Sequence, residues 1–161
     1  MRKKVVLDTN VLLNYLDHGG DGFEVVLRII EKCKELEIVS CPRMLNELVN
    51  TLYNRRKIAP RFADMLVRNL ITTLEGFEKI SICKYVPQHL ILDMSRKDKY
   101  FCEFSVQTEV SYVISNDEHH FSPVKDVMRE NYNIAVVSCS DFLTIEGHLE
   151  DWNRFNIFTL Y

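Results

Sequence analysis

The chain has 161 residues, which fits a single domain large enough to bury a core without disulfide or metal cross-links. Hydrophobic residues make up 47% of it and the mean hydropathy is -0.11, as expected for a soluble globular protein. The net charge of -3 excludes a general electrostatic attraction to nucleic acid, so such a partner would need a local basic patch or a metal ion.

No apolar run reaches the roughly 18 residues that cross a bilayer, and the stretch after Met1 to Lys4 is too short for a signal peptide. We therefore expect a cytoplasmic protein with no membrane partner. The five cysteines show neither zinc-binding nor disulfide spacing, so we expect free, mostly buried thiols. They are Cys33, Cys41, Cys83, Cys102 and Cys139.

Short β-branched runs predict strands, and apolar residues at helical spacing predict helices. The predicted strands are 5–7, 38–41, 79–83, 112–115 and 134–137. The predicted helices are 10–16, 23–37, 42–54, 61–74, 87–94, 98–108, 123–131 and a last one capped by Ser140 and Asp141 that runs to Ile145. Because strands alternate with helices, we expect an α/β fold with a central parallel sheet, in which 42–54 and 61–74 form a helical hairpin.

No linker or repeat divides the chain, so residues 1–146 are expected to form one domain. Residues 147–161 form a tail with four aromatic side chains, Trp152, Phe155, Phe158 and Tyr161. This tail is too aromatic for a solvated end, and we expect it to pack on the same domain or on a second subunit.

The first strand ends on an acid, in the stretch Val5-Val6-Leu7-Asp8, and Thr9 and Asn10 then open an apolar helix. Open α/β sheets bind ligands at the carboxyl ends of their strands, where Asp8 is expected to lie. The alternative is that Asp8 only belongs to a turn in which Thr9 or Asn10 caps the helix.

Two more acids have comparable positions. Asp117 follows the predicted strand 112–115, and Asp98 lies on the same helix face as Phe101, Cys102 and Ser105 at about 100° per residue. For Asp98, an interaction with the positive N-terminus of its own helix is an equal alternative to ligand binding. Clustered carboxylates repel one another unless a divalent cation neutralises them, and Mg²⁺ or Mn²⁺ at such a site could activate water against a phosphodiester.

These residues give the chain a resemblance to the PIN-domain nucleases, particularly the small stand-alone members that include VapC-type toxins of toxin–antitoxin pairs. Asp8-Thr9-Asn10 resembles the opening strand-acid motif of the family, and Asn46-Glu47-Leu48 its acidic position in a helix. Asp98 to Ser105 resembles the family's acid followed by an apolar helix, and Val110 to Asp117 its strand ending in an acid. The likeness runs from about Val5 to Ile145.

The resemblance implies a three-layer α/β/α sandwich and a metal-dependent endoribonuclease. Four acids would bind one or two Mg²⁺ or Mn²⁺ ions and carry the catalysis: Asp8, Glu47, Asp98 and Asp117. Thr9, Asn10 and Ser115 would orient these carboxylates or a coordinated water. The role of Glu47 rests on the resemblance alone, because its position on the helical wheel would otherwise indicate a solvated side chain.

The chain departs from the family pattern at His119, where many members carry another acid. His119 is a candidate further metal ligand, although a histidine brings no negative charge and the alternative is a solvated loop residue. RNA would need nearby cations, and the candidates are Arg55, Arg56, Arg96, Lys97 and Lys99. Their alternative role is that of a solvated surface.

The resemblance therefore predicts that the chain hydrolyses RNA, and it also implies a toxin role, an antitoxin partner and a homodimer. The principal alternative is a non-catalytic PIN-like module that binds RNA or a partner protein. Metal binding would discriminate the two, because a scaffold needs no metal. A haloacid-dehalogenase phosphatase is disfavoured, because its second acid would fall where Asn10 stands.

Overall fold

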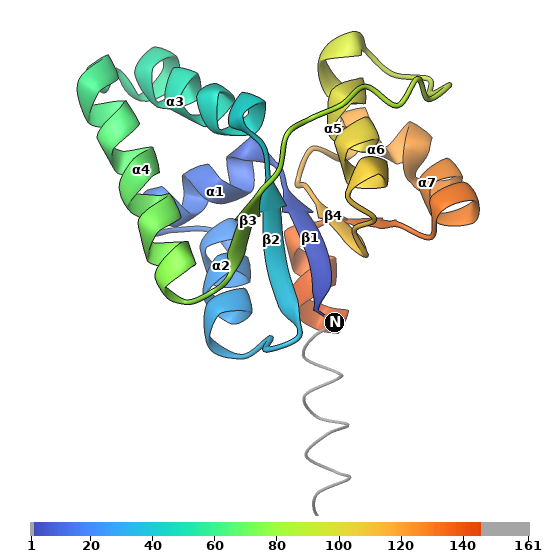
Figure 1. The fold of residues 1–161 in the computed structure, drawn as a ribbon, viewed down its shortest axis with the longest axis horizontal. Helices are drawn as coiled ribbons and strands as arrows, with labels where there is room; N and C mark the ends of the chain where they lie inside the picture. The colour runs from blue at the N-terminus through green and yellow to red at the C-terminus, as the bar shows by residue number, and fades with distance from the viewer. Residues whose placement is uncertain (1, 146–161) are drawn as a thin grey trace, which may run out of the picture.

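β1 (Lys3–Leu7) lies at the centre of a five-stranded sheet in which every pairing is parallel. The computed structural model describes residues 2–145, apart from the side chain of Lys97. The strand order is β3-β2-β1-β4-β5 (Figure 1). The other strands are β2 (Leu36–Ser40), β3 (Ile80–Ile82), β4 (Tyr112–Ile114) and β5 (Ala135–Val137).

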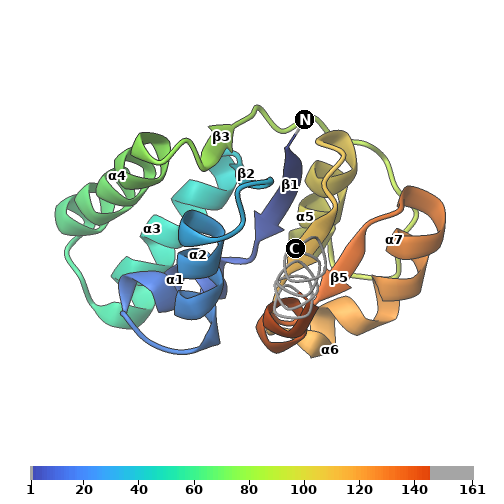
Figure 2. The ribbon, with the colours of Figure 1, turned by 90° about the horizontal axis from the view of Figure 1, so that it is seen from below.

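Helices cover both faces of this sheet, as Figures 1 and 2 show. One layer holds α1 (Thr9–Leu16), α2 (Asp21–Glu31), α3 (Pro42–Arg56), α4 (Pro60–Gly76) and the helical residues 139–145. The other holds α5 (Arg96–Gln107), α6 (Glu118–Phe121), a 3₁₀ turn (Ser122–Val124) and α7 (Lys125–Tyr132). The predicted α/β/α sandwich is confirmed, and α3 and α4 pack together as the expected hairpin.

The apolar side chains of β1 are buried on both faces of the sheet. Val5 and Leu7 pack into the core beneath α1 to α4, whereas Val6 packs into the core on the α5 side. A strand buried on both faces reads as a continuous apolar run, because it has no solvent side to alternate with. Polar side chains are therefore found in the residues that follow the strand, and the first of these is Asp8.

Several predicted element boundaries were wrong. α2 ends at Glu31 rather than residue 37, because Leu36 and Glu37 pair with β1 in the sheet. Residues 87–94 form no helix, and His89 has a φ of 53°, which is incompatible with a right-handed helix.

The segment predicted as one helix at 123–131 is instead a 3₁₀ turn followed by α7. The last helix starts at residue 139, and its cap is Ser138 rather than Ser140 and Asp141. The Oγ atom of Ser138 accepts a 3.0 Å hydrogen bond from the backbone N–H of Asp141.

Other sequence expectations concern cysteines, membrane segments and the tail. All five cysteines are free thiols, as predicted, and all except the half-buried Cys83 are buried. Within residues 2–145, none of the helices combines the length and apolar character needed to cross a membrane. The aromatic tail at 147–161 lies outside the described residues.

We predict that Gly22→Ala destabilises the fold. A Cβ atom at Gly22 would lie 2.8 Å from the carbonyl oxygen of Val11, because the start of α2 packs closely on α1. The free energy of unfolding, measured by urea denaturation, should fall by about 1–3 kcal/mol. Gly76→Ala is the matched control, since nothing lies within 4 Å of its added Cβ and stability should stay equal or rise. Equal stability of the two variants would contradict the close packing of α1 and α2.

Candidate active site

Four acidic side chains line one cavity of about 290 Å³ beyond the carboxyl ends of β1 and β4. They come from four separate segments: Asp8 after β1, Glu47 in α3, Asp98 in the first turn of α5 and Asp117 after β4. All four acids singled out in the sequence thus meet at one edge of the sheet. Thr9 and Asn10 also line this acidic cavity.

Asp8 is held by two hydrogen bonds. Its Oδ1 atom accepts from the backbone N–H of Thr9 at 2.7 Å, and its Oδ2 atom accepts from the hydroxyl of Ser115 at 2.7 Å. Asp8 itself is the N-cap of α1, so the alternative in which Thr9 or Asn10 caps this helix is wrong. The short polar side chain of an N-cap residue satisfies a backbone donor that has no partner within the helix.

Burial is the main influence on the Asp8 carboxyl, and it raises the pKa above the ordinary value of 3.8. The hydrogen bonds from Ser115 and Thr9 lower this pKa, and the neighbouring carboxylates of Glu47 and Asp117 raise it. Desolvation penalises the charged form, and like charges add to that penalty. The site therefore holds a carboxylate whose ionised form is costly unless a cation is near.

Ser115 links two of the acids at the end of β4. Its buried hydroxyl donates to Asp8 and accepts a 3.0 Å hydrogen bond from the backbone N–H of Asp117. A single side chain therefore fixes the position of Asp8 relative to the start of the loop that carries Asp117.

The histidine at the cavity is His120 rather than His119. The Nδ1 atom of His120 lies 2.6 Å from Oδ2 of Asp117, and this contact raises the pKa of the exposed imidazole. His119 is exposed and does not line the cavity. His120 was not predicted as a site residue, because this region was expected to be a loop. The signal was the Asp-x-x-His spacing, which brings the two side chains together once α6 begins at Glu118.

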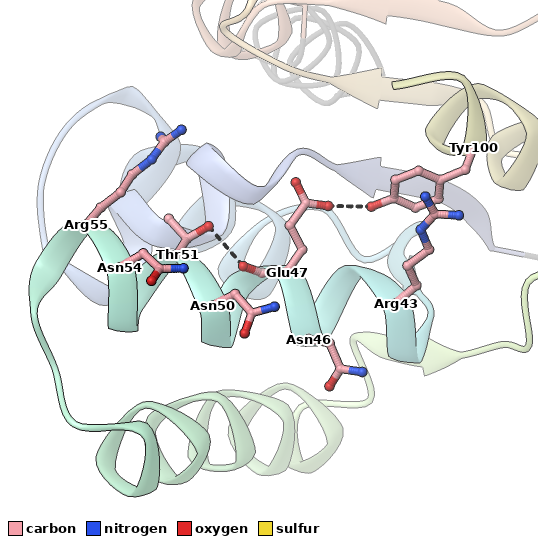
Figure 3. Close-up of a pocket in the computed structure, with 8 residues that line it drawn as sticks. All are labelled: Arg43, Asn46, Glu47, Asn50, Thr51, Asn54, Arg55 and Tyr100. Atoms are coloured by element: carbon pink, nitrogen blue, oxygen red, sulfur yellow. Dashed lines mark hydrogen bonds between the residues drawn. The ribbon is translucent and has the colours of Figure 1, made fainter. Parts of the chain in front are cut away.

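Glu47 is positioned by a tyrosine from the opposite layer. The hydroxyl of Tyr100 donates a 2.6 Å hydrogen bond to Oε2 of Glu47, as Figure 3 shows. The Arg43 guanidinium lies 3.8 Å from the centre of the Tyr100 ring. Burial raises the pKa of Tyr100, and the bond to Glu47 raises it further, so the tyrosine remains a donor. No periodicity in the sequence connects α3 with α5, which is why this contact was not predicted.

Asp98 lies in the first turn of its own helix and also lines the acidic cavity. Ser95 caps α5, and its hydroxyl donates to Oδ2 of Asp98 at 2.7 Å while accepting from the Asp98 backbone N–H at 3.3 Å. The same carboxylate lines the acidic cavity. Its interaction with the helix terminus therefore orients the carboxylate without removing it from the site.

The predicted basic residues are distributed unevenly. Arg55 lines the acidic cavity, whereas Arg56 forms an ion pair with Asp17, with 2.5 Å between the nitrogen and the oxygen. Arg96 is exposed and Lys99 is half-buried, and neither lines the cavity. The side chain of Lys97 is not among those described.

The chemistry of these donors fits a hard divalent cation. All four acids offer carboxylate oxygens, which Mg²⁺ and Mn²⁺ prefer, and a cation would offset the burial and the smaller like-charge repulsion that raise the pKa of Asp8. Among the described residues, no three His, Cys, Asp or Glu side chains are grouped closely enough to hold an ion. Binding would therefore require these side chains to turn toward a common point.

A family model and a solved structure agree with this fold. The sequence model of the PIN domain matches residues 4–119, a span that includes all four acids, and the chain belongs to the PIN-domain family. The structure of VapBC2 from Rickettsia felis bound to a DNA fragment from their promoter matches with a TM-score of 0.50 and 11% identity, covering 84% of this chain and 98% of that one. The PIN domain endonuclease Utp24 matches with a TM-score of 0.48 and 18% identity, covering 84% of each chain. Curated protein sequences give no match.

We predict that Asp8→Asn stabilises the metal-free protein at neutral pH. The pKa of Asp8 is higher in the folded than in the unfolded chain, so ionisation costs stability above the folded pKa, and this cost disappears as the pH falls toward 3.8. The free energy of unfolding in EDTA should rise by about 1 kcal/mol at neutral pH, with a smaller gain in acid. Urea denaturation at both pH values measures this.

Asp126→Asn is the control for the Asp8 variant, because Asp126 is exposed on α7 and lines none of the cavities described. It should show no comparable gain at neutral pH. If Asp8→Asn were less stable than the wild type, the hydrogen bonds from Ser115 and Thr9 would outweigh the cost of burial, contrary to our interpretation.

Proposed function

We propose that this protein is a metal-dependent endoribonuclease that hydrolyses RNA phosphodiester bonds. The observation that carries this proposal is the convergence of Asp8, Glu47, Asp98 and Asp117 on one cavity from four separate segments. Membership of the PIN-domain family supports it, because the match spans the same residues.

In this proposal the four carboxylates hold one or two Mg²⁺ or Mn²⁺ ions. The cation supplies the positive charge that activates water and offsets the charge developing on the phosphate. The chain's own contribution is orientation: Ser115 directs Asp8, Tyr100 directs Glu47, and Ser95 directs Asp98. Each of these bonds leaves lone pairs on the carboxylate, because its two oxygens have about four acceptor sites.

RNA must reach an acidic site on a chain with a net charge of -3. The position of Arg55 supports such a role, since it lines the acidic cavity together with Glu47 and Thr51. An arginine there could contact a phosphate that the carboxylates alone would repel. The same contact would serve the alternative function, a non-catalytic module that binds RNA, so catalysis has to be tested directly.

We predict cleavage of a mixed panel of labelled RNAs in Mn²⁺ or Mg²⁺, with none in EDTA. Asp8→Asn and Asp98→Asn should each lower the rate by at least about 100-fold, because each removes a charge that holds the cation. Asp126→Asn should cut at the wild-type rate, since its side chain lies on α7 away from the acidic cavity. Calorimetric titration with Mn²⁺ on the same proteins measures metal binding independently.

The outcomes separate the two functions. Equal cutting by all variants would point to a contaminating nuclease and contradict the proposal. Metal binding that requires Asp8 and Asp98 without any cleavage would contradict endoribonuclease activity on the panel. Absence of metal binding would favour the non-catalytic module.

We also propose that the protein acts as the toxin of a toxin–antitoxin pair in the cytoplasm, as a homodimer whose acidic cavity an antitoxin protein would cover. The sequence resemblance to VapC-type toxins supports this role, and so does the likeness of the fold to VapBC2.

Induced expression in a bacterial host should arrest growth if the toxin role is correct. Asp98→Asn should abolish the arrest while accumulating to the same level, because it removes one of the four carboxylates of the acidic cavity. Growth curves and immunoblots measure the two quantities. Growth arrest that persists in the Asp98→Asn variant would show that toxicity does not come from this site.

A further inference from the structure

A second cavity of about 660 Å³ runs along the exposed surface of α3 and adjoins the acidic cavity. We call it the α3 groove. It shares Glu47, Thr51, Arg55 and Tyr100 with the acidic cavity and adds Arg43, Asn46, Asn50 and Asn54 (Figure 3). If the phosphate of an RNA chain lies among the four acids, the neighbouring nucleotides would therefore contact the side chains of this groove.

The asparagines of the groove form a row. Asn46, Asn50 and Asn54 are spaced by four residues, and Asn50 and Asn54 lie within about 20° of Arg43 on the helical wheel. All three residues are exposed, and none of their amides makes a hydrogen bond to a described residue. Each amide thus has two donors and an acceptor available to a ligand.

Exposure to solvent alone does not explain three asparagines on one side of a helix. Asparagine is a poor helix former, because its side chain competes for backbone hydrogen bonds. The neighbouring helix α4 shows the usual alternative, with Asp64 and Arg68 paired at a nitrogen-to-oxygen distance of 2.7 Å. The amide row of α3 is therefore better explained by a ligand than by solvation.

Arg43 offers a flat surface at one end of the row. One face of its guanidinium packs on the ring of Tyr100, with Cζ 3.8 Å from the centroid. The Tyr85 ring centroid lies 5.9 Å from the same atom, and the residue as a whole is exposed. Unpaired RNA bases stack on arginine planes and hydrogen-bond through their edges to polar side chains. A base stacked on Arg43 would thus lie about one helical turn from Asn46, the first residue of the row.

We propose that the α3 groove is a nucleobase-binding site for single-stranded RNA, in which a base stacks on Arg43 and the three asparagine amides bind base edges. Asparagine pairs with adenine through two hydrogen bonds, so we expect adenine to be preferred. This inference rests on the proposed function for the position of the scissile phosphate. It goes beyond that function by assigning the residues that select the sequence. The groove has no aliphatic side chain in its lining, which disfavours a protein partner there.

The test is fluorescence anisotropy with short labelled oligo(A), oligo(C) and oligo(U) in Mg²⁺, in an Asp8→Asn background, where cleavage is expected to be at least about 100-fold slower. The variant with Asn46→Ala, Asn50→Ala and Asn54→Ala should bind oligo(A) at least about tenfold more weakly and lose its preference over oligo(U). Because no charge is removed, the dependence of log Kd on log salt should keep its slope.

Two further variants complete the design. Arg43→Lys keeps the charge but removes the stacking plane, so affinity should fall about tenfold with the same salt slope. Asn69→Ala removes an exposed asparagine from α4, away from the groove, and should change nothing. Alanine favours helices, so the substitutions in α3 should not lower the midpoint of unfolding.

The result that overturns the inference is equal binding of every oligonucleotide by the triple variant and by Asn69→Ala. Absence of measurable binding to any of them would overturn it as well. RNA cleavage at unchanged sites and rates by the triple variant would leave the ribonuclease proposal standing and refute the groove. Adenine-selective binding that depends on the asparagines, without any cleavage, would support the groove and contradict the ribonuclease proposal.

Discussion

The candidate site of this protein depends on one topological constraint, which brings four carboxylates to the same edge of a parallel sheet. Parallel strands all end at the same edge, so Asp8 and Asp117, which follow β1 and β4, are brought close together by topology alone. α3 and α5 add Glu47 and Asp98 from opposite layers. The surrounding donors, Ser115, Tyr100 and Ser95, hold the carboxylates in place, yet burial and mutual repulsion still raise the pKa of Asp8.

Much of the fold followed from the sequence, because the apolar pattern and the alternation of strands with helices are local signals. The strands were found within a few residues, and the acids at strand ends followed from them. The errors lie where tertiary contacts override local preference. Leu36 and Glu37 continue a helical pattern but pair with β1, and residues 87–94 contain a left-handed His89 that no propensity indicates.

The site was predictable to the extent that each acid carried its own signal. Strand ends indicated Asp8 and Asp117, and helix periodicity indicated Asp98, whereas Glu47 was found only through resemblance to a family. Partners contributed by other segments had no signal of this kind, and Tyr100 and Arg43 are examples. His120 was missed for a smaller reason, since α6 is a single turn and the helical spacing that joins it to Asp117 begins only at Glu118.

Arg43, Tyr100 and Glu47 form one continuous chain of contacts between the α3 groove and the acidic cavity. A ligand that immobilises Arg43 would also restrict the motion of Tyr100, which packs against it. Glu47 would then lose less conformational entropy when it is ordered by a cation. Such coupling is reciprocal, so a cation that orders Glu47 would strengthen binding at Arg43 by the same factor. One coupling free energy would then link the choice of base to the occupancy of the metal site. The residues that carry it lie on α3 and α5, on opposite sides of the sheet.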